Sequence, residues 1–243
     1  MAASRQATRF DPRSAARALL EALREGEPIS ALPEGAVPQT ATQGWRVARA
    51  VLAELDLPVV GFRALADGLA GPLLAPRLVA AGVQVPLAAL PGLQASAACV
   101  VPLARALPPR SEPYSLRRIL AALGPARAAI DLAAWRTSTR PTTAALRIAD
   151  LCGLGMLVVA DPPRGAASVD LGALRVSWNE DPAVVVDVTP QLVAAAEAAR
   201  LAGGLPAGAA LVATGLTPTH APPSGTVLSV RVVGAGKASV TLV

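Results

Sequence analysis

The sequence has few aromatic residues and almost no lysine, histidine or cysteine. Aromatic residues make up 2% of the 243 residues, and Lys237 is the single lysine among 22 basic side chains. The arginines stand singly, apart from the adjacent pair in "LRR" at 116–118. Nucleic-acid binding needs a basic patch and usually aromatic residues that stack on bases. We therefore expect no nucleic-acid partner, in spite of the net charge of +5.

Cysteine is too scarce for a disulfide framework or a cysteine-based metal motif. Cys99 and Cys152 both lie among apolar residues and lack the C-x-x-C spacing. We interpret them as two buried, reduced thiols.

Long apolar runs are absent as well. The longest uncharged stretch, 83–104, is broken by Pro86, Pro91 and Pro102, which a membrane-spanning helix would not tolerate. The first 28 residues are rich in arginine and serine, but they include acidic residues and have no apolar core. We expect a cytoplasmic protein without a membrane segment.

The residues that are present predict helices first and strands later. Apolar residues recur at helical spacing over 12–26 and 40–55, with the breaker-rich linker "ISALPEGAVPQT" between them. From "LPVVGFRAL" onward, short β-branched runs alternate with Gly and Pro. Strands are predicted near 58–63, 97–104, 128–133, 156–160, 173–178, 183–187, 209–214, 226–233 and 237–243.

Three further helices are predicted among the strands, at 115–123, 141–151 and 189–202. In the last of these Thr189 is the expected N-cap and Pro190 lies in the first turn. This order of elements favours an α+β fold with a mostly antiparallel or mixed sheet. We divide it into an N-terminal helical region, 1–57, and a β-rich domain, 58–243.

Two short motifs could suggest chemistry but have simpler interpretations. "GAGK" at 234–237 lacks the spacing and the Ser/Thr of a phosphate loop, and it joins two predicted strands, so we predict a hairpin turn. His220, the single histidine, has no evident nucleophile or acid to complete a triad, so we predict an exposed loop residue.

The order of several segments along the chain is more informative than any one motif. "VVGFRAL" is followed by "GPLLAPRLVAAG", "ASAACVVPLARALPPR", "AAIDLAAWR", "RIADLCGLGMLVVADPP" and a C-terminal block that begins "LPAGAALVATGLTP". This series resembles the 2-keto-4-pentenoate hydratase and 4-oxalocrotonate decarboxylase branch of the fumarylacetoacetate hydrolase superfamily. The resemblance implies a mixed, curled β-sheet domain with a small N-terminal helical region, and assembly into oligomers.

The resemblance also implies a site for Mg²⁺ or Mn²⁺ held by three carboxylates. Alternate residues of a strand share one face, so a Glu-x-Glu pair presents two carboxylates to one hard cation. The metal then polarises the carbonyl of a 2-oxo acid. In this sequence the Glu-x-Glu positions fall at Ser96 and Ala98, and the third ligand falls at Asp131. No acid lies between Asp67 and Glu112, so a shift of register cannot restore the pair.

Other positions that the family keeps polar also differ. The lysine of the family's "VGWK" falls at Arg63, which could grip a substrate carboxylate but could not act as a base. Pro76 stands where an aspartate is expected. The family's "ADNAS" reads "ADLCG", which keeps Asp150 but places Leu151 and Cys152 at the polar positions.

Two functional interpretations follow from the resemblance. In the first, the chain is a hydratase-like lyase for a small 2-oxo or 2-hydroxydienoate acid, with metal-dependent activity weakened or lost. Arg63 would bind the acid, Asp131 would hold any remaining metal, and Asp150, Thr214 and Gly215 would line the pocket. In the second, it is an inactive homologue that serves as a structural or regulatory partner, or binds a small anion at Arg63.

We expect Mg²⁺ or Mn²⁺ to bind weakly at best, and we expect a homo-oligomer or a complex with a related enzyme. Asp131 and Asp150 also have a purely structural interpretation. Asp150 would cap or pair locally, and Asp131 would pair with Arg127 or Arg136, which we favour for Asp131 because a lone carboxylate is a poor Mg²⁺ site.

Overall fold

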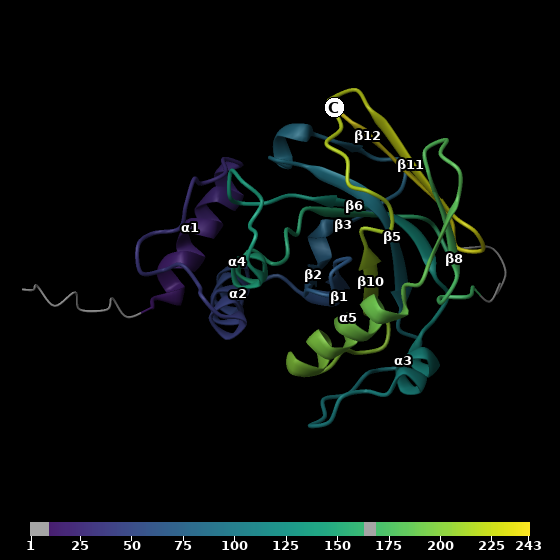
Figure 1. The fold of residues 1–243 in the computed structure, drawn as a ribbon, viewed down its shortest axis with the longest axis horizontal. Coiled ribbons are helices and arrows are strands. Elements are labelled where there is room, and N and C mark those ends of the chain that lie inside the picture. The colour runs from purple at the N-terminus through teal and green to yellow at the C-terminus, as the bar shows by residue number, and fades with distance from the viewer. Residues whose placement is uncertain (1–9, 163–168) are drawn as a thin grey trace, which may run out of the picture.

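The structure, a computed structural model, describes residues 10–162 and 169–243 and contains two β-sheets with helices packed around them (Figure 1). The helices are α1 (Pro12–Glu25), α2 (Ala41–Leu55), α3 (Leu116–Ala122), α4 (Ala144–Ala149) and α5 (Thr189–Leu201). The larger sheet has the order β2 (Ala70–Leu74), β1 (Val59–Ala64), β10 (Ala210–Thr214), β5 (Gln94–Pro102), β6 (Arg127–Ala133), β7 (Met156–Val159), β3 (Leu78–Ala80). The smaller sheet has the order β4 (Gln84–Val85), β12 (Gly236–Leu242), β11 (Val227–Val232), β8 (Leu174–Trp178), β9 (Val184–Val186). Both parallel and antiparallel pairs occur, so the predicted α+β class with a mixed sheet is confirmed.

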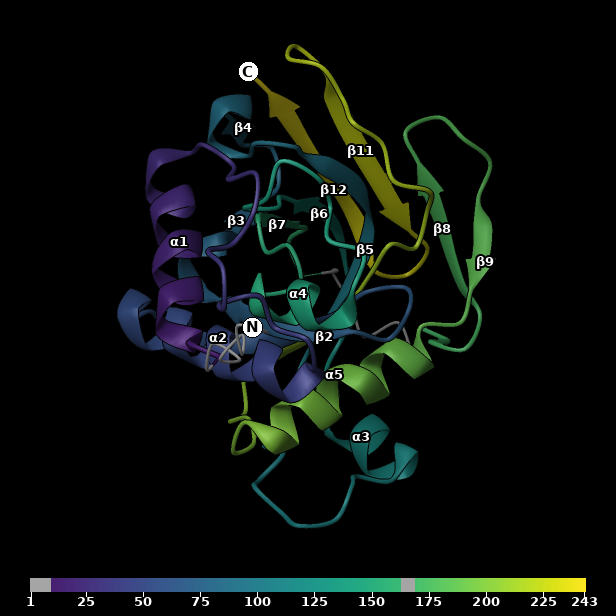
Figure 2. The same cartoon turned by 60° about the vertical axis from the view of Figure 1, so that its left-hand side comes forward.

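The larger sheet is covered on both faces. One face packs against α1, α2 and the 149–154 region through a cluster that includes Leu19, Val47, Val51, Val100 and Val212. The other face packs against α5 and the smaller sheet. Figure 2 shows α1 and α2 on one side of the molecule, with β8, β11 and β12 across from them. Alternation along each strand therefore sends neighbouring residues into two different cores.

Every predicted strand and helix is present, with ends shifted by a few residues. The structure adds β2, β3 and β4, which the sequence pattern did not indicate. β2 reads "AGPLL", and its proline pairs with Phe62 of β1. β2 is the edge strand of its sheet, the position at which strands tolerate proline. β3 and β4 are three and two residues long, too short to produce a periodic pattern.

Helix ends follow their capping residues, with one correction. The side chains of Asp11 and Thr40 accept hydrogen bonds from the first turns of α1 and α2. Thr189 was predicted to cap α5 but is the first helical residue instead. Asp187 accepts from both the backbone N–H and the hydroxyl of Thr189, so the aspartate stabilises the entry to the helix.

The predicted turn at 234–237 and the predicted exposure of His220 are confirmed. Val232 and Gly236 pair at the closed end of the β11–β12 hairpin. His220 is exposed, exchanges backbone hydrogen bonds with Ala95 and stacks on Trp178, with ring centroids 5.7 Å apart.

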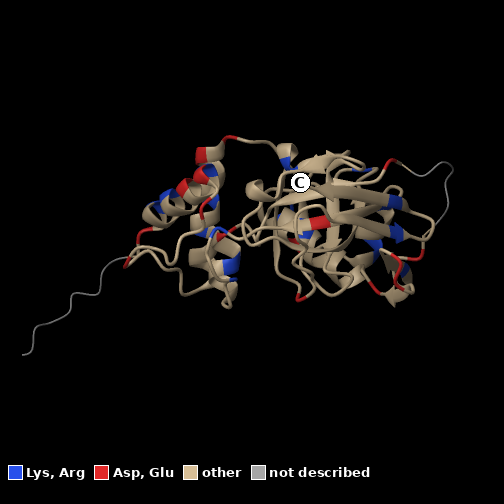
Figure 3. Ribbon diagram, turned by 90° about the horizontal axis from the view of Figure 1, so that it is seen from above, with Lys and Arg blue, Asp and Glu red and all other residues tan. Residues whose placement is uncertain are grey.

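Charged residues lie mostly away from the sheets. Figure 3 shows them on the N-terminal helices and at the edges of the β-rich part, while the ribbon of the sheets is mostly uncharged. No helix within 10–162 and 169–243 is both long and apolar enough to cross a membrane. Because α1 and α2 share a core with the large sheet, the boundary at 57/58 stays a prediction.

The contact between α2 and α4 depends on Gly44. A Cβ atom at this position would lie 2.4 Å from the carbonyl oxygen of Ala145 in α4. Replacing Gly by Ala within a helix normally stabilises it by about 1 kcal/mol. Here we expect Gly44→Ala to lower the free energy of unfolding by about 1–3 kcal/mol, because the two helices must separate. Urea denaturation measures this, with exposed Thr42→Ala in the same helix as the control; a raised midpoint for Gly44→Ala would contradict the contact.

Candidate functional site

Five of the positions singled out from the sequence lie on one face of the large sheet. Ser96 is paired with Asp131 across β5 and β6, and Ala98 is paired with Thr214 across β5 and β10. Arg63 of β1 is paired with Val212, two residues before Thr214 on β10. The residues at the positions of the family's metal ligands and of its lysine therefore lie close together on one face of the sheet.

A buried ion pair occupies this face. The Nη2 of Arg63 donates to the Oδ2 of Asp131 at 2.7 Å, and its Nη1 donates to the backbone carbonyl of Cys152 at 3.2 Å. The side chain of Arg63 is 0% exposed and that of Asp131 is 6% exposed. The last carboxylate of the compared ligand set is thus neutralised by a guanidinium from the same chain.

The prediction that Asp131 pairs with Arg127 or Arg136 is wrong. Arg127 lies on the same strand four residues away, about 13 Å along an extended chain. It donates to the carbonyl of Ala160 instead. Arg136 follows the end of β6 and pairs with Asp150.

The Arg63–Asp131 contact requires the sheet to curl. Strands β10 and β5 separate β1 from β6, so the two strands would lie about 14 Å apart in a flat sheet. A long arginine side chain spans the remaining gap once the sheet bends round this face. The contact could not be inferred from sequence, because it depends on the order and curvature of four strands.

The turn after α4 covers Arg63. Leu151, Cys152 and Gly153 all have positive φ, at 48°, 56° and 71°. Such a run is unfavourable for Leu and Cys, and it persists only where the surroundings hold it. Here Cys152 N–H donates to the Arg147 carbonyl at 2.7 Å, and Gly153 N–H donates to the Asp150 carbonyl at 2.8 Å. The turn aims the Cys152 carbonyl at Arg63.

Trp135 packs on the outside of this turn. A Cβ atom added to Gly153 would lie 2.7 Å from the Trp135 ring, so the indole rests directly on the glycine. Trp135 is itself buried. In the structure the turn is therefore closed over the ion pair.

Most of the other polar groups on this face are hydrogen-bonded within the protein. Ser96 Oγ accepts from the Gly215 N–H at 3.2 Å, and Thr214 Oγ1 donates to the Ala64 carbonyl at 3.2 Å. Gln191 of α5, which sequence reasoning missed, donates to the Thr214 carbonyl at 2.6 Å. Among the residues described, the Nε–H of Arg63 is one of two buried side-chain nitrogens without a partner.

Asp150 belongs to a neighbouring pair rather than to the Arg63 cluster. Its carboxylate binds the Arg136 side chain and accepts from the Arg136 backbone N–H at 3.0 Å. The predicted local pairing of Asp150 is therefore confirmed. A third pair, Arg147 with Asp67, ties α4 to the β1–β2 turn, and no sequence pattern had indicated it.

Burial dominates the titration of these groups. It raises the pKa of Asp131, while the Arg63 guanidinium opposes the shift. Burial likewise raises the pKa of Asp150 against the effect of Arg136. It raises the pKa of the Cys99 and Cys152 thiols to about 12, so both stay protonated near neutral pH, and neither is a nucleophile. Both cysteines are buried and free, as predicted.

The residues present do not fit a divalent metal. Mg²⁺ prefers six oxygen ligands in octahedral geometry. This face offers one carboxylate already bound to a cation, and Ala98 offers no donor at all. Within 10–162 and 169–243, no group of three or more His, Cys, Asp or Glu side chains is arranged to hold a metal ion.

Comparison with solved structures places the fold. The 4-oxalocrotonate decarboxylase of Pseudomonas putida G7, complexed with magnesium and adipate, superposes with a TM-score of 0.80 over 96% of this chain and 97% of that chain, at 16% identity. This chain has the fold of 4-oxalocrotonate decarboxylase. The same enzyme complexed with calcium and acetate also gives a TM-score of 0.80, at 17% identity.

A further solved structure shares part of this fold. The 2-hydroxyhepta-2,4-diene-1,7-dioate isomerase of Mycobacterium marinum gives a TM-score of 0.51 at 14% identity, covering 77% of this chain and 76% of that chain. No family model and no curated protein sequence matches the chain. The fold expected from the resemblance is thus confirmed by the structure.

The buried ion pair predicts how substitutions of Arg63 and Asp131 change the free energy of unfolding. Removing one member of a buried pair leaves an uncompensated charge and costs about 3–5 kcal/mol, whereas replacing both by apolar residues is often neutral. We expect Arg63→Met and Asp131→Leu each to lower the free energy of unfolding by about that amount, and the double variant to recover most of it. Urea denaturation of the three variants gives the coupling energy, and additive losses would contradict the pairing.

The pH dependence of Arg63→Met follows from the same pair. Without the guanidinium, burial is opposed only by a hydrogen bond from Thr214, so the folded-state pKa of Asp131 rises further. A group with a raised folded-state pKa contributes stability at low pH that is lost as the pH rises through that pKa. The deficit of Arg63→Met relative to the natural chain should therefore grow from pH 5 to pH 8. Parallel denaturation curves measure it, and a deficit that stays constant with pH would contradict the expected rise in the pKa of Asp131.

Proposed function

We propose that this chain is a metal-independent homologue of the 2-oxo acid lyases, built on the decarboxylase fold, and acts as a structural or regulatory partner without hydratase turnover. The observation that carries the proposal is the Arg63–Asp131 ion pair, at 2.7 Å and almost fully buried. At this distance the guanidinium neutralises the Asp131 carboxylate and occupies the position beside it that a metal ion would need. The lyase fold is kept, and its electrophile is replaced by a side chain.

The other positions support the same conclusion. Ser96 bonds a backbone N–H and Ala98 is apolar, so neither contributes charge to the site. Arg63 cannot act as a base near neutral pH. The related structures are described with magnesium, calcium or manganese, whereas the residues here offer no comparable set of oxygen ligands.

A partner role is supported by exposed apolar side chains. Leu116 and Leu120 of α3 are 45% and 41% exposed, and Val185 of β9 is 65% exposed. Exposed apolar residues in groups are typical of interaction surfaces. We propose a homo-oligomer, or a complex with a related enzyme, in the cytoplasm.

A second candidate is the binding of a small anion at Arg63 without turnover. The Nε–H of this side chain has no partner among the residues described, so one strong donor is free for a carboxylate such as that of a 2-oxo acid. The binding requires that the turn at 151–153 open, since Arg63 is 0% exposed.

The decisive test is turnover of 2-hydroxypenta-2,4-dienoate. We expect no loss of its absorbance over the purified chain with Mg²⁺, Mn²⁺ or EDTA, because no cation can reach Asp131 while Arg63 is bound to it. Metal-stimulated turnover that disappears in Asp131→Ala would refute the proposal. Metal-independent turnover would point to chemistry centred on Arg63.

The face can also be tested by restoring carboxylates to it. In the variant Arg63→Lys, Ser96→Glu, Ala98→Glu, two new carboxylates face Asp131, and we expect Mn²⁺ to raise the melting temperature. The natural chain should show no such rise. The control variant Arg63→Lys, Ser96→Gln, Ala98→Gln has similar side-chain sizes without the charge. Equal responses to Mn²⁺ in the two variants would show that the metal binds elsewhere.

A further inference from the structure

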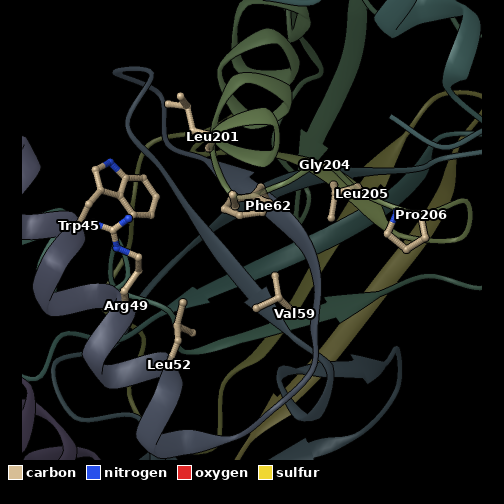
Figure 4. A pocket seen from close by; sticks show the side chains of 11 residues that line it. Trp45, Arg49, Leu52, Val59, Phe62, Leu201, Gly204, Leu205 and Pro206 are labelled. Atoms are coloured by element: carbon tan, nitrogen blue, oxygen red, sulfur yellow. The ribbon is translucent and has the colours of Figure 1, made fainter. Parts of the chain in front are cut away.

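A second candidate binding site lies beside β1, in a cavity that no residue of the Arg63 cluster lines. Consecutive strand residues point to opposite faces, so Phe62 faces away from the ion pair and into a separate cavity of about 360 Å³. Its walls come from α2, the start of β1, the end of α5 and the segment 204–206 (Figure 4). The volume falls within the range of small-molecule sites.

The cavity is lined by apolar groups with one charged exception. Trp45 and Leu52 of α2 line one wall, and Phe62 and Leu205 lie across from them. Leu201, at the end of α5, also lines the cavity and is 67% exposed. An aliphatic or aromatic body would therefore lose water contact on several sides.

Arg49 is the one charged residue that lines this cavity. It lies one helical turn after Trp45, on the same face of α2. It is exposed, and within 10–162 and 169–243 its side chain makes no hydrogen bond or ion pair, in contrast to the side chains of Arg63, Arg136, Arg147 and Arg200. A planar guanidinium beside an apolar cavity matches a single carboxylate, which it can bind through two parallel hydrogen bonds.

We propose that this cavity binds a medium-length aliphatic or aromatic monocarboxylate, with its carboxylate on Arg49 and its apolar body between α2 and α5. A phosphate or a dicarboxylate fits less well, since a second negative charge would lie in an apolar cavity without a second cation. The proposal does not depend on the proposed function, because no residue of the Arg63 cluster lines the cavity.

The test is isothermal titration of the purified chain with sodium octanoate, and with 1-octanol as the uncharged match. We expect saturable binding of octanoate at one site per chain, and binding of octanol that is at least about tenfold weaker, because the charged hydrogen bonds are lost. Arg49→Met should weaken octanoate to the level of octanol. The control Arg46→Met, which removes an arginine of α2 outside this cavity, should leave the affinity unchanged.

A blocking variant locates the binding. Ala202 lies at the exposed rim, and Ala202→Trp should fill the cavity and abolish binding without disturbing the core. Octanoate that binds Arg49→Met and Ala202→Trp as tightly as it binds the natural chain would overturn the proposal. Octanoate binding that does not saturate would also overturn it. Absence of octanoate binding would also overturn it. One such case is a second copy of the chain that covers the cavity. Sedimentation would reveal this arrangement as a dimer, and Leu201→Glu would dissociate it.

Discussion

The Arg63–Asp131 ion pair is the interaction on which the interior of this molecule depends. It joins β1 to β6 across two intervening strands, and through Nη1 it also holds the turn that follows α4. Both charges are removed from water, so each is tolerable only in the presence of the other. The curl of the sheet, the strained turn and the packing of Trp135 are consistent with this one requirement.

The same pair supports the proposal of a metal-independent protein on this fold. A cation between strands can be supplied by a bound ion or by a side chain, and a guanidinium satisfies the electrostatic need of a lone buried carboxylate. Its charge is fixed and its donors are directional, so it stabilises a closed interior. It offers no open coordination position at which a substrate carbonyl could bind.

The two faces of β1 illustrate how one strand serves two environments. Arg63 points into a closed polar cluster, and its neighbour Phe62 points toward an open apolar cavity. The proposed acid site and the Arg63 cluster are therefore adjacent in sequence, yet no residue of the cluster lines the cavity. Arg49, unlike the arginines of the interior, lies at a cavity without an acidic partner among the described residues.

Much of the fold could be predicted from the sequence, because helix periodicity, β-branched runs and glycine turns are local signals. The α+β class, the early helices, the C-terminal hairpin and the absence of carboxylates at Ser96 and Ala98 all follow from the order of residues. Only the tertiary structure decided the partner of Asp131, which sequence neighbours had suggested to be Arg127 or Arg136. That choice depends on the order of strands in the sheet and on its curvature, which bring together residues 68 positions apart. Local patterns carry no information about which distant strand will lie opposite, so the sequence shows which residues stand at Ser96, Ala98 and Asp131, while only the fold shows that Asp131 binds Arg63.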